Sequence, residues 1–143
     1  MKLNQILTTD TSRATILIRL MVGAVFLSEG IQKFLFADTL GAGRFAKIGL
    51  PNPEFLGSFV GLFEILAGLL ILAGLFTRLA AMITLVIMLV AFATTKSTVL
   101  RQEGIWEMLH GSRTDWAMLL GSMFLILKGG GAYSVDRKIA NNG

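Results

Sequence analysis

The chain has 143 residues, of which 54% are hydrophobic and 15% are charged, with a formal net charge of +4 and a mean hydropathy of +0.71. Soluble domains usually carry about 25% charged residues, so this composition indicates a membrane protein. The sequence holds no cysteine and one histidine, which excludes thiol–disulfide chemistry, a thiolate nucleophile, an iron–sulfur cluster bound by this chain and haem ligation by two of its histidines.

Four apolar stretches approach the length of about 20 residues that a helix needs to cross a bilayer. They cover residues 14–36, 55–76, 79–95 and 115–128. The sequence therefore predicts an all-α membrane protein, a single transmembrane domain over residues 1–143 built as a four-transmembrane-helix bundle. The first stretch is too long and too charged for the apolar core of a secretory signal, so we expect the mature protein to keep it.

The connections between these stretches differ in character. The first long connection ends at Pro51 and Pro53, and proline favours the start of a helix. A turn of a few residues joins the second stretch to the third, which predicts an antiparallel hairpin. The second long connection mixes Trp106 and other apolar side chains with charges, which is typical of a segment at the membrane surface. We expect short interfacial segments in both long connections.

The even number of predicted helices places the N- and C-termini on the same side of the membrane. Basic residues divide evenly between the two sides, so their count does not fix the orientation. The basic C-terminal tail and the turn at Thr77–Arg78 favour cytoplasmic termini. The basic residues are scattered over helix ends and loops rather than gathered in one patch, so we expect no nucleic-acid partner.

Charged residues interrupt the first two apolar stretches at Arg19, Glu29, Lys33 and Glu64. Each would cost about 2.5–3.5 kcal/mol at the centre of a spanning helix. At 100° per residue, those on the first helix fall within an arc of roughly 80°. We expect these residues to form one buried polar cluster with Glu64 near the membrane midplane. This cluster is the candidate ligand-binding site, because buried ionisable groups in membrane proteins usually serve a function.

Structural explanations exist for the same charges. Arg19 and Lys33 can extend their charged ends to opposite membrane surfaces while their stems stay in the apolar region. Glu64 lies too deep for that, so its structural alternative is a salt bridge or hydrogen bond between helices. The candidate cluster therefore either holds a ligand or only joins two helices.

Glycines line one face of each of the first two helices. They are Gly23 and Gly30 beside the charged arc of the first helix, and Gly57, Gly61 and Gly68 on the face of Glu64 in the second. Small residues let two helix backbones approach closely. We expect these glycines to mark helix packing, either within one chain or between copies in a homo-oligomer.

Other motifs indicate little chemistry. The glycines of GGGAY follow no predicted strand, so they end the fourth helix rather than form a dinucleotide-binding loop. His110, with Glu103 and Glu107 nearby in sequence, would make a poor metal site, and we expect no bound metal.

Several stretches resemble the DoxX family of small bacterial four-helix membrane proteins. They are R…G…F…G..K in the first helix, AKIGLPNP, FEILAGLLILAGLFTRLAA, MLVAFAT and GGGAYSVD. The positions that match the family pattern are Arg19, Gly23, Gly30, Lys33, Gly49, Pro51, Glu64, Gly74, Thr77, Arg78, Ala81, Gly129, Gly131, Ser134 and Asp136. Asp115 departs from this pattern, which has a glutamate there.

The resemblance implies a multi-pass protein of the bacterial inner (cytoplasmic) membrane, similar to the small subunit of thiosulfate:quinone oxidoreductase. We therefore consider three functions. The first is a membrane subunit, or a module that binds quinone or another small molecule, in a redox system with a soluble or membrane redox partner. The second is a structural anchor that assembles with soluble redox enzymes, and the third is a small homo-oligomeric transporter. The sequence shows no self-contained catalytic motif, so an oxidoreductase role would be that of a subunit in the lipid bilayer.

Overall fold

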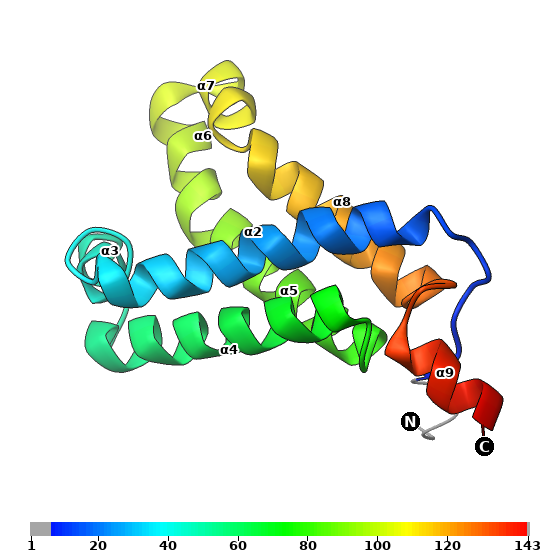
Figure 1. Ribbon diagram of the computed structural model, residues 1–143. Coiled ribbons are helices and arrows are strands. Elements are labelled where there is room, and N and C mark those ends of the chain that lie inside the picture. Colours follow the sequence, from blue (N-terminus) through cyan, green and yellow to red (C-terminus); the bar gives the residue numbers. More distant parts are fainter. Residues whose placement is uncertain (1–6, 143) are drawn as a thin grey trace.

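A computed structural model describes residues 7–142 of the chain, and this part is helical without any strand (Figure 1). The elements are α2 (Thr15–Leu35), α3 (Ala42–Lys47), α4 (Pro53–Ala73), α5 (Thr77–Ala91), the π-helix η1 (Phe92–Lys96), α6 (Ser97–Glu103), α7 (Ile105–Gly111), α8 (Arg113–Lys128) and α9 (Val135–Asn142).

Three helical runs are long and apolar enough to cross a membrane, namely Thr15–Leu35, Pro53–Ala73 and Thr77–Glu103. The predicted all-α membrane architecture is thereby confirmed. Helix α8 has 16 residues, which is below the roughly 20 needed for a straight crossing. Among the described residues, helix length therefore establishes three spans and not the fourth span of the predicted bundle.

Helices α2 and α4 lie side by side as an antiparallel pair (Figure 1). Glycine makes their close approach possible. A β-carbon added at Gly30 would lie 2.7 Å from the carbonyl oxygen of Gly61, and one added at Gly68 would lie 2.6 Å from the amide nitrogen of Leu27. Gly23 similarly faces the Gly68 carbonyl oxygen at 3.0 Å. These glycines thus pack two helices of one chain together.

Helix α3 packs against the first half of α4. At this contact a β-carbon on Gly57 would lie 2.7 Å from the backbone nitrogen of Ala42 in α3, so this glycine serves α3 rather than α2. Helix α4 begins at Pro53, two residues before the predicted start, because the fixed φ of proline suits the first helical turn. These contacts hold α3 over the α2–α4 pair.

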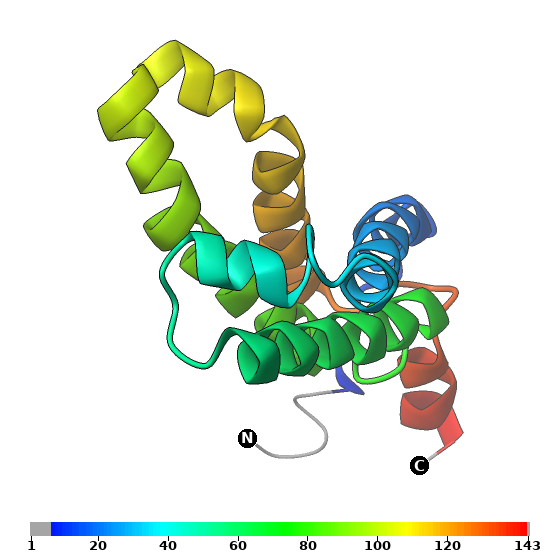
Figure 2. The ribbon, with the colours of Figure 1, turned by 90° about the vertical axis from the view of Figure 1, so that its left-hand side faces the viewer.

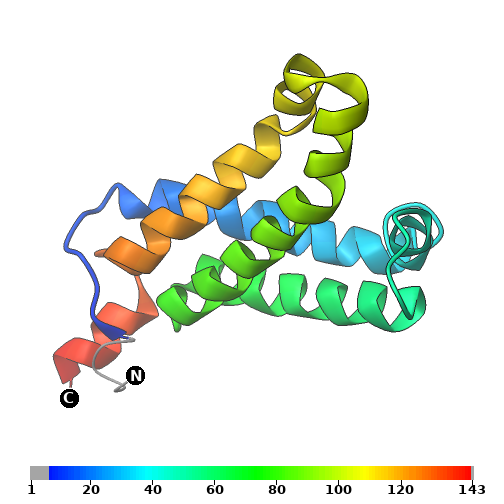
Figure 3. The same ribbon diagram turned by 180° about the vertical axis from the view of Figure 1, so that it is seen from behind.

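Helices α5 and α8 form the second pair, which crosses the first (Figure 3). The buried core between the pairs includes Phe26, Ile71 and Leu125. A hydrogen bond of 2.7 Å between Thr84 Oγ1 of α5 and Ser122 Oγ of α8 lies within this region. Toward their far ends α5–η1–α6 and α8 diverge, and α3 lies near the opening between them (Figure 2).

The third helical run extends beyond its predicted end at residue 95. Helix α5 passes through η1 into α6 and ends only at Gly104, whose φ of 92° suits glycine. The surface segment predicted between the third and fourth spans forms two short helices, α6 and α7, rather than one. These helices project from the bundle (Figure 1). Trp106 at its tip is 80% exposed.

Candidate functional site

The centre of the candidate site is an ion pair between Lys33 of α2 and Glu64 of α4. Lys33 Nζ donates a hydrogen bond of 3.0 Å to Glu64 Oε1 and lies 2.7 Å from Oε2. The side chains are 11% and 4% exposed. Close packing at Gly61 brings the stem of Lys33 onto α4, since a β-carbon on that glycine would lie 3.3 Å from Lys33 Cβ. The glycine stripe therefore positions the pair.

Glu64 Oε2 is buried and lies within ion-pair distance of Lys33 Nζ, and no other described residue donates a hydrogen bond to it. Two cations, Lys33 and Arg44, attract the Glu64 carboxylate, whereas Glu29 repels it. Glu29 is half-buried on α2. The Glu64 carboxylate is thus held chiefly by Lys33.

A cavity of about 280 Å³ opens beside this ion pair. Its charged lining consists of Lys33, Arg44, Glu64 and Asp115. The remaining walls are mainly apolar and come from α3, α4, α5 and η1, namely Phe45, Ile48, Leu50, Phe59, Val60, Val86, Ile87, Met88, Val90, Ala91, Thr94 and Thr95. Small-molecule sites typically combine apolar walls with a few convergent polar groups, and this cavity has that composition.

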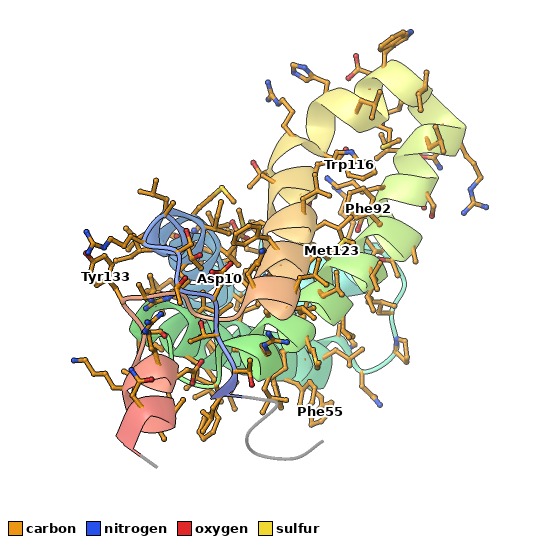
Figure 4. All side chains as sticks on the ribbon, turned by 90° about the vertical axis from the view of Figure 1, so that its right-hand side faces the viewer. Asp10, Phe55, Phe92, Trp116, Met123 and Tyr133 are labelled. Atoms are coloured by element: carbon orange, nitrogen blue, oxygen red, sulfur yellow. The ribbon has the colours of Figure 1, made fainter. Side chains whose placement is uncertain are left out.

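A second ion pair closes the cavity on the side of η1 and α8. Lys96 Nζ lies 2.8 Å from Asp115 Oδ2 and donates a hydrogen bond of 2.9 Å to the carbonyl oxygen of Gly111. Next to it the rings of Phe92 and Trp116 point toward each other, with 4.9 Å between their centroids (Figure 4). Both Phe92 and Lys96 belong to η1, and π-helical turns occur frequently at functional sites.

An apolar groove of about 300 Å³ continues from the cavity between α4 and α5. It is lined by Phe59, Val60, Phe63, Met82, Ile83, Val86 and Ile87. Phe59, Val60, Val86 and Ile87 also line the cavity, so the two spaces are adjacent. A cavity with four charged lining residues and an apolar groove therefore lie next to each other along one side of α4.

The prediction that Arg19 joins the Glu64 cluster is wrong. Arg19 is 3% exposed and lies at the opposite end of α2, where it binds backbone carbonyl groups. Its Nε donates to the Ile71 oxygen at 2.8 Å, one Nη to Leu72, and the other Nη to Gly130 at 3.2 Å and Tyr133 at 2.5 Å. Unpaired carbonyl groups at the end of α4 attract a cation more directly than the distant carboxylate does.

Asp136 belongs to this other end of the molecule as well. It is 1% exposed, and its two carboxylate oxygens accept hydrogen bonds from the backbone nitrogens of Phe76 at 2.7 Å and Thr77 at 2.9 Å. The start of α5 at Thr77 is thereby capped by a residue just inside α9, a helix that we did not predict. Arg78 donates hydrogen bonds to the backbone carbonyl oxygens of Thr8 and Leu127. It therefore belongs to this end of the molecule and not to the Glu64 site. Both residues hold the termini against the bundle.

Sequence reasoning missed Arg44 of α3 and the part played by Asp115 and Lys96. Arg44 comes from a connection that we regarded as an interfacial turn, and only its packing against α4 brings it to the cavity. Pro51 lies exposed in the same connection. His110 is exposed on α7, and no group of three or more potential metal ligands occurs within residues 7–142.

Residues 14–97 match the sequence model of the DoxX family, which includes the region of the Lys33–Glu64 pair. The chain belongs to the DoxX family. Among relatives of this DoxX protein, "Uncharacterized membrane protein Rv3486" of Mycobacterium tuberculosis is 47% identical over 133 residues, covering 89% of this chain and 82% of that protein. "Putative oxidoreductase CatD" of Bacillus subtilis is 26% identical over 122 residues, covering 85% of this chain and 84% of that protein. No solved structure matches the DoxX chain significantly.

Proposed function

We propose that this DoxX protein is a membrane-embedded module that binds a quinone, or a small molecule of similar shape, for a redox system. The observation that carries the proposal is the cavity at the buried Lys33–Glu64 pair, together with the apolar groove that continues from it. A quinone has the matching form, a compact oxygen-bearing head group and an apolar tail. The name "Putative oxidoreductase CatD" of a relative supports a redox context.

The polar groups of the cavity suit both redox forms of a quinone head group. Lys33 and Arg44 can donate hydrogen bonds to carbonyl oxygens of the oxidised form. The Glu64 carboxylate, which lines the cavity, can accept the O–H of the reduced form. A pocket that offers donors and an acceptor in a poorly hydrated setting stabilises a bound head group, since hydrogen bonds to charged groups contribute about 1.5–3 kcal/mol each.

The proposal also covers the redox partner of the module and its arrangement in the membrane. The sequence has no cysteine and one histidine, so we propose that electrons pass to or from a redox partner protein. We propose further that α8 with its flanking turns completes a four-helix arrangement in the bacterial inner membrane, with both termini in the cytoplasm. The α6–α7 hairpin would then lie on the opposite side.

Thermal unfolding in a non-ionic detergent tests the proposal. The unfolding temperature of the purified protein should rise with short-chain ubiquinone or menaquinone analogues, because a ligand at 100 times its Kd adds about 2.7 kcal/mol of stability. In Glu64→Gln the rise should be largely lost when measured against that variant's own baseline. Glu54→Gln is the matched control, since Glu54 is an exposed acid on the same helix. The proposal fails if neither analogue raises the unfolding temperature, or if Glu64→Gln responds as fully as the control.

A further inference from the structure

One of the charges that line the cavity has no ion-pair partner among the described residues. Of its four charged lining residues, Lys33 pairs with Glu64, and Asp115 pairs with Lys96. Arg44 forms no ion pair and no side-chain hydrogen bond with any residue between 7 and 142, although its charge attracts Glu64. The two ion pairs leave Arg44 as the charged lining residue without an ion-pair partner among the described residues.

The charge of Arg44 is permanent, and the cavity that it lines is mainly apolar. An arginine side chain stays protonated at all physiological pH values and presents several donors in a planar fork that suits carboxylate-like oxygens. Apolar walls formed by Phe45, Ile48 and Leu50 surround the cavity near Arg44. Arg44 is itself exposed, and near a protein surface two charges still attract more strongly than in bulk water. The cavity therefore favours a ligand that brings a negative charge.

The groove determines which kind of chain can be attached to the head group of the ligand. It shares Phe59, Val60, Val86 and Ile87 with the cavity, and all seven of its lining residues are apolar. A single hydrocarbon chain attached to the head group can follow this continuous apolar path while the head group stays beside Arg44. Burying each methylene group of such a chain contributes about 0.8 kcal/mol.

We propose that the site selects amphiphiles whose head group carries an ionised oxygen, and that Arg44 is the residue that determines this preference. The ligand class is an anionic head group, such as an ionised hydroxyquinone, with one apolar chain. This inference rests on the proposed quinone site and adds the charge of its ligand. Neutral quinones bind through the remaining contacts but more weakly.

The test compares two naphthoquinones that share the same 3-alkyl chain. The 2-hydroxy compound is ionised at neutral pH, and the 2-methoxy compound is neutral. Their Kd values are measured by isothermal titration calorimetry on the full-length protein in a non-ionic detergent. The native protein should bind the hydroxy compound about tenfold more tightly, which corresponds to one charge-assisted hydrogen bond. In Arg44→Gln this preference should disappear, because the Kd for the hydroxy compound rises far more than the Kd for the methoxy compound.

Two further variants distinguish an effect of the Arg44 charge from an effect on the fold. Arg44→Lys keeps the charge and should keep most of the preference. Arg101→Gln removes an exposed arginine of α6 that does not line the cavity, and it should behave as the native protein. Equal or tighter binding of the methoxy compound by the native protein overturns the inference but leaves quinone binding intact. A preference that persists in Arg44→Gln overturns it as well.

A third pair of ligands distinguishes this inference from the proposed function. Oleate and methyl oleate differ in the same charge but contain no quinone. Binding of oleate that depends on Arg44, without binding of either naphthoquinone, supports the charge preference and refutes the quinone function. Binding of none of the four compounds refutes both.

Discussion

Replacing Lys33 and Glu64 by methionine, singly and together, shows whether their ion pair holds two helices or holds a ligand. The two side chains lie 2.7 Å apart and are almost fully buried. Removing one partner leaves an uncompensated buried charge, which costs about 3–5 kcal/mol. Removing both leaves neither charge, and apolar replacements of similar volume are often neutral or stabilising. We therefore expect each single variant to be strongly destabilised and the double variant to regain most of the stability.

The free energy of unfolding can be measured by titrating the protein in dodecyl maltoside with SDS and following helix content by circular dichroism. The partly exposed pair of Asp10 and Lys128 provides the control cycle, whose coupling should be no more than about 1 kcal/mol. A double variant of Lys33 and Glu64 that is destabilised by the sum of its single variants would refute the coupling. A stable double variant that binds quinone as tightly as the native protein would show that quinone binding does not need the pair.

Three further predictions concern other parts of the molecule. Gly68→Ala should lower the free energy of unfolding by about 1–3 kcal/mol, because its β-carbon meets backbone atoms of α2, whereas Gly111→Ala has open space and should be nearly neutral in the same titration. Asp136→Ala removes the cap of α5 and should cost about 2 kcal/mol, which urea unfolding in mild detergent would detect, and an unchanged midpoint would contradict the capping role. The hydrogen bond from Lys128 lowers the pKa of Asp10 below 3.8, so its stabilising effect is present above pH 3.8 and is lost as the pH falls through the lowered value. Lys128→Met should return the NMR titration midpoint of Asp10 toward 3.8, and a midpoint that does not move would exclude Lys128 as the cause.

Patterns that repeat along one helix were readable from the sequence. Hydropathy located the long apolar helices, and the spacing of Gly61 and Gly68 placed the contact between α2 and α4 on the correct face. Lys33 was one of the partners considered for Glu64, because helical geometry restricts which side chains can face the second helix. Each of these inferences depends on the fixed 3.6-residue period of a helix.

Features that depend on distant parts of the chain could not be predicted. Arg19 binds backbone carbonyl groups. Every residue has such a group, so the sequence does not show which residues are its partners. Arg44 reaches the cavity only through the packing of α3 on α4. Asp136 caps a helix that begins 59 residues earlier in the chain, as its contact with Thr77 shows. Short-range patterns contain no information on such contacts.

The contacts of Arg19 have a consequence for the biosynthesis of this protein. Arg19 leaves the ribosome long before Gly130 and Tyr133, two of the residues whose carbonyl groups it binds. Until they are made, its guanidinium lacks part of its partners and has to stay near the membrane surface, as an arginine near a helix end can do. The N-terminal helix pair can form early, but it reaches its final stability only when the C-terminal loop arrives. Chains truncated before Gly130 should therefore stay exposed to membrane proteases, which gives the cell a means of distinguishing finished copies from unfinished ones.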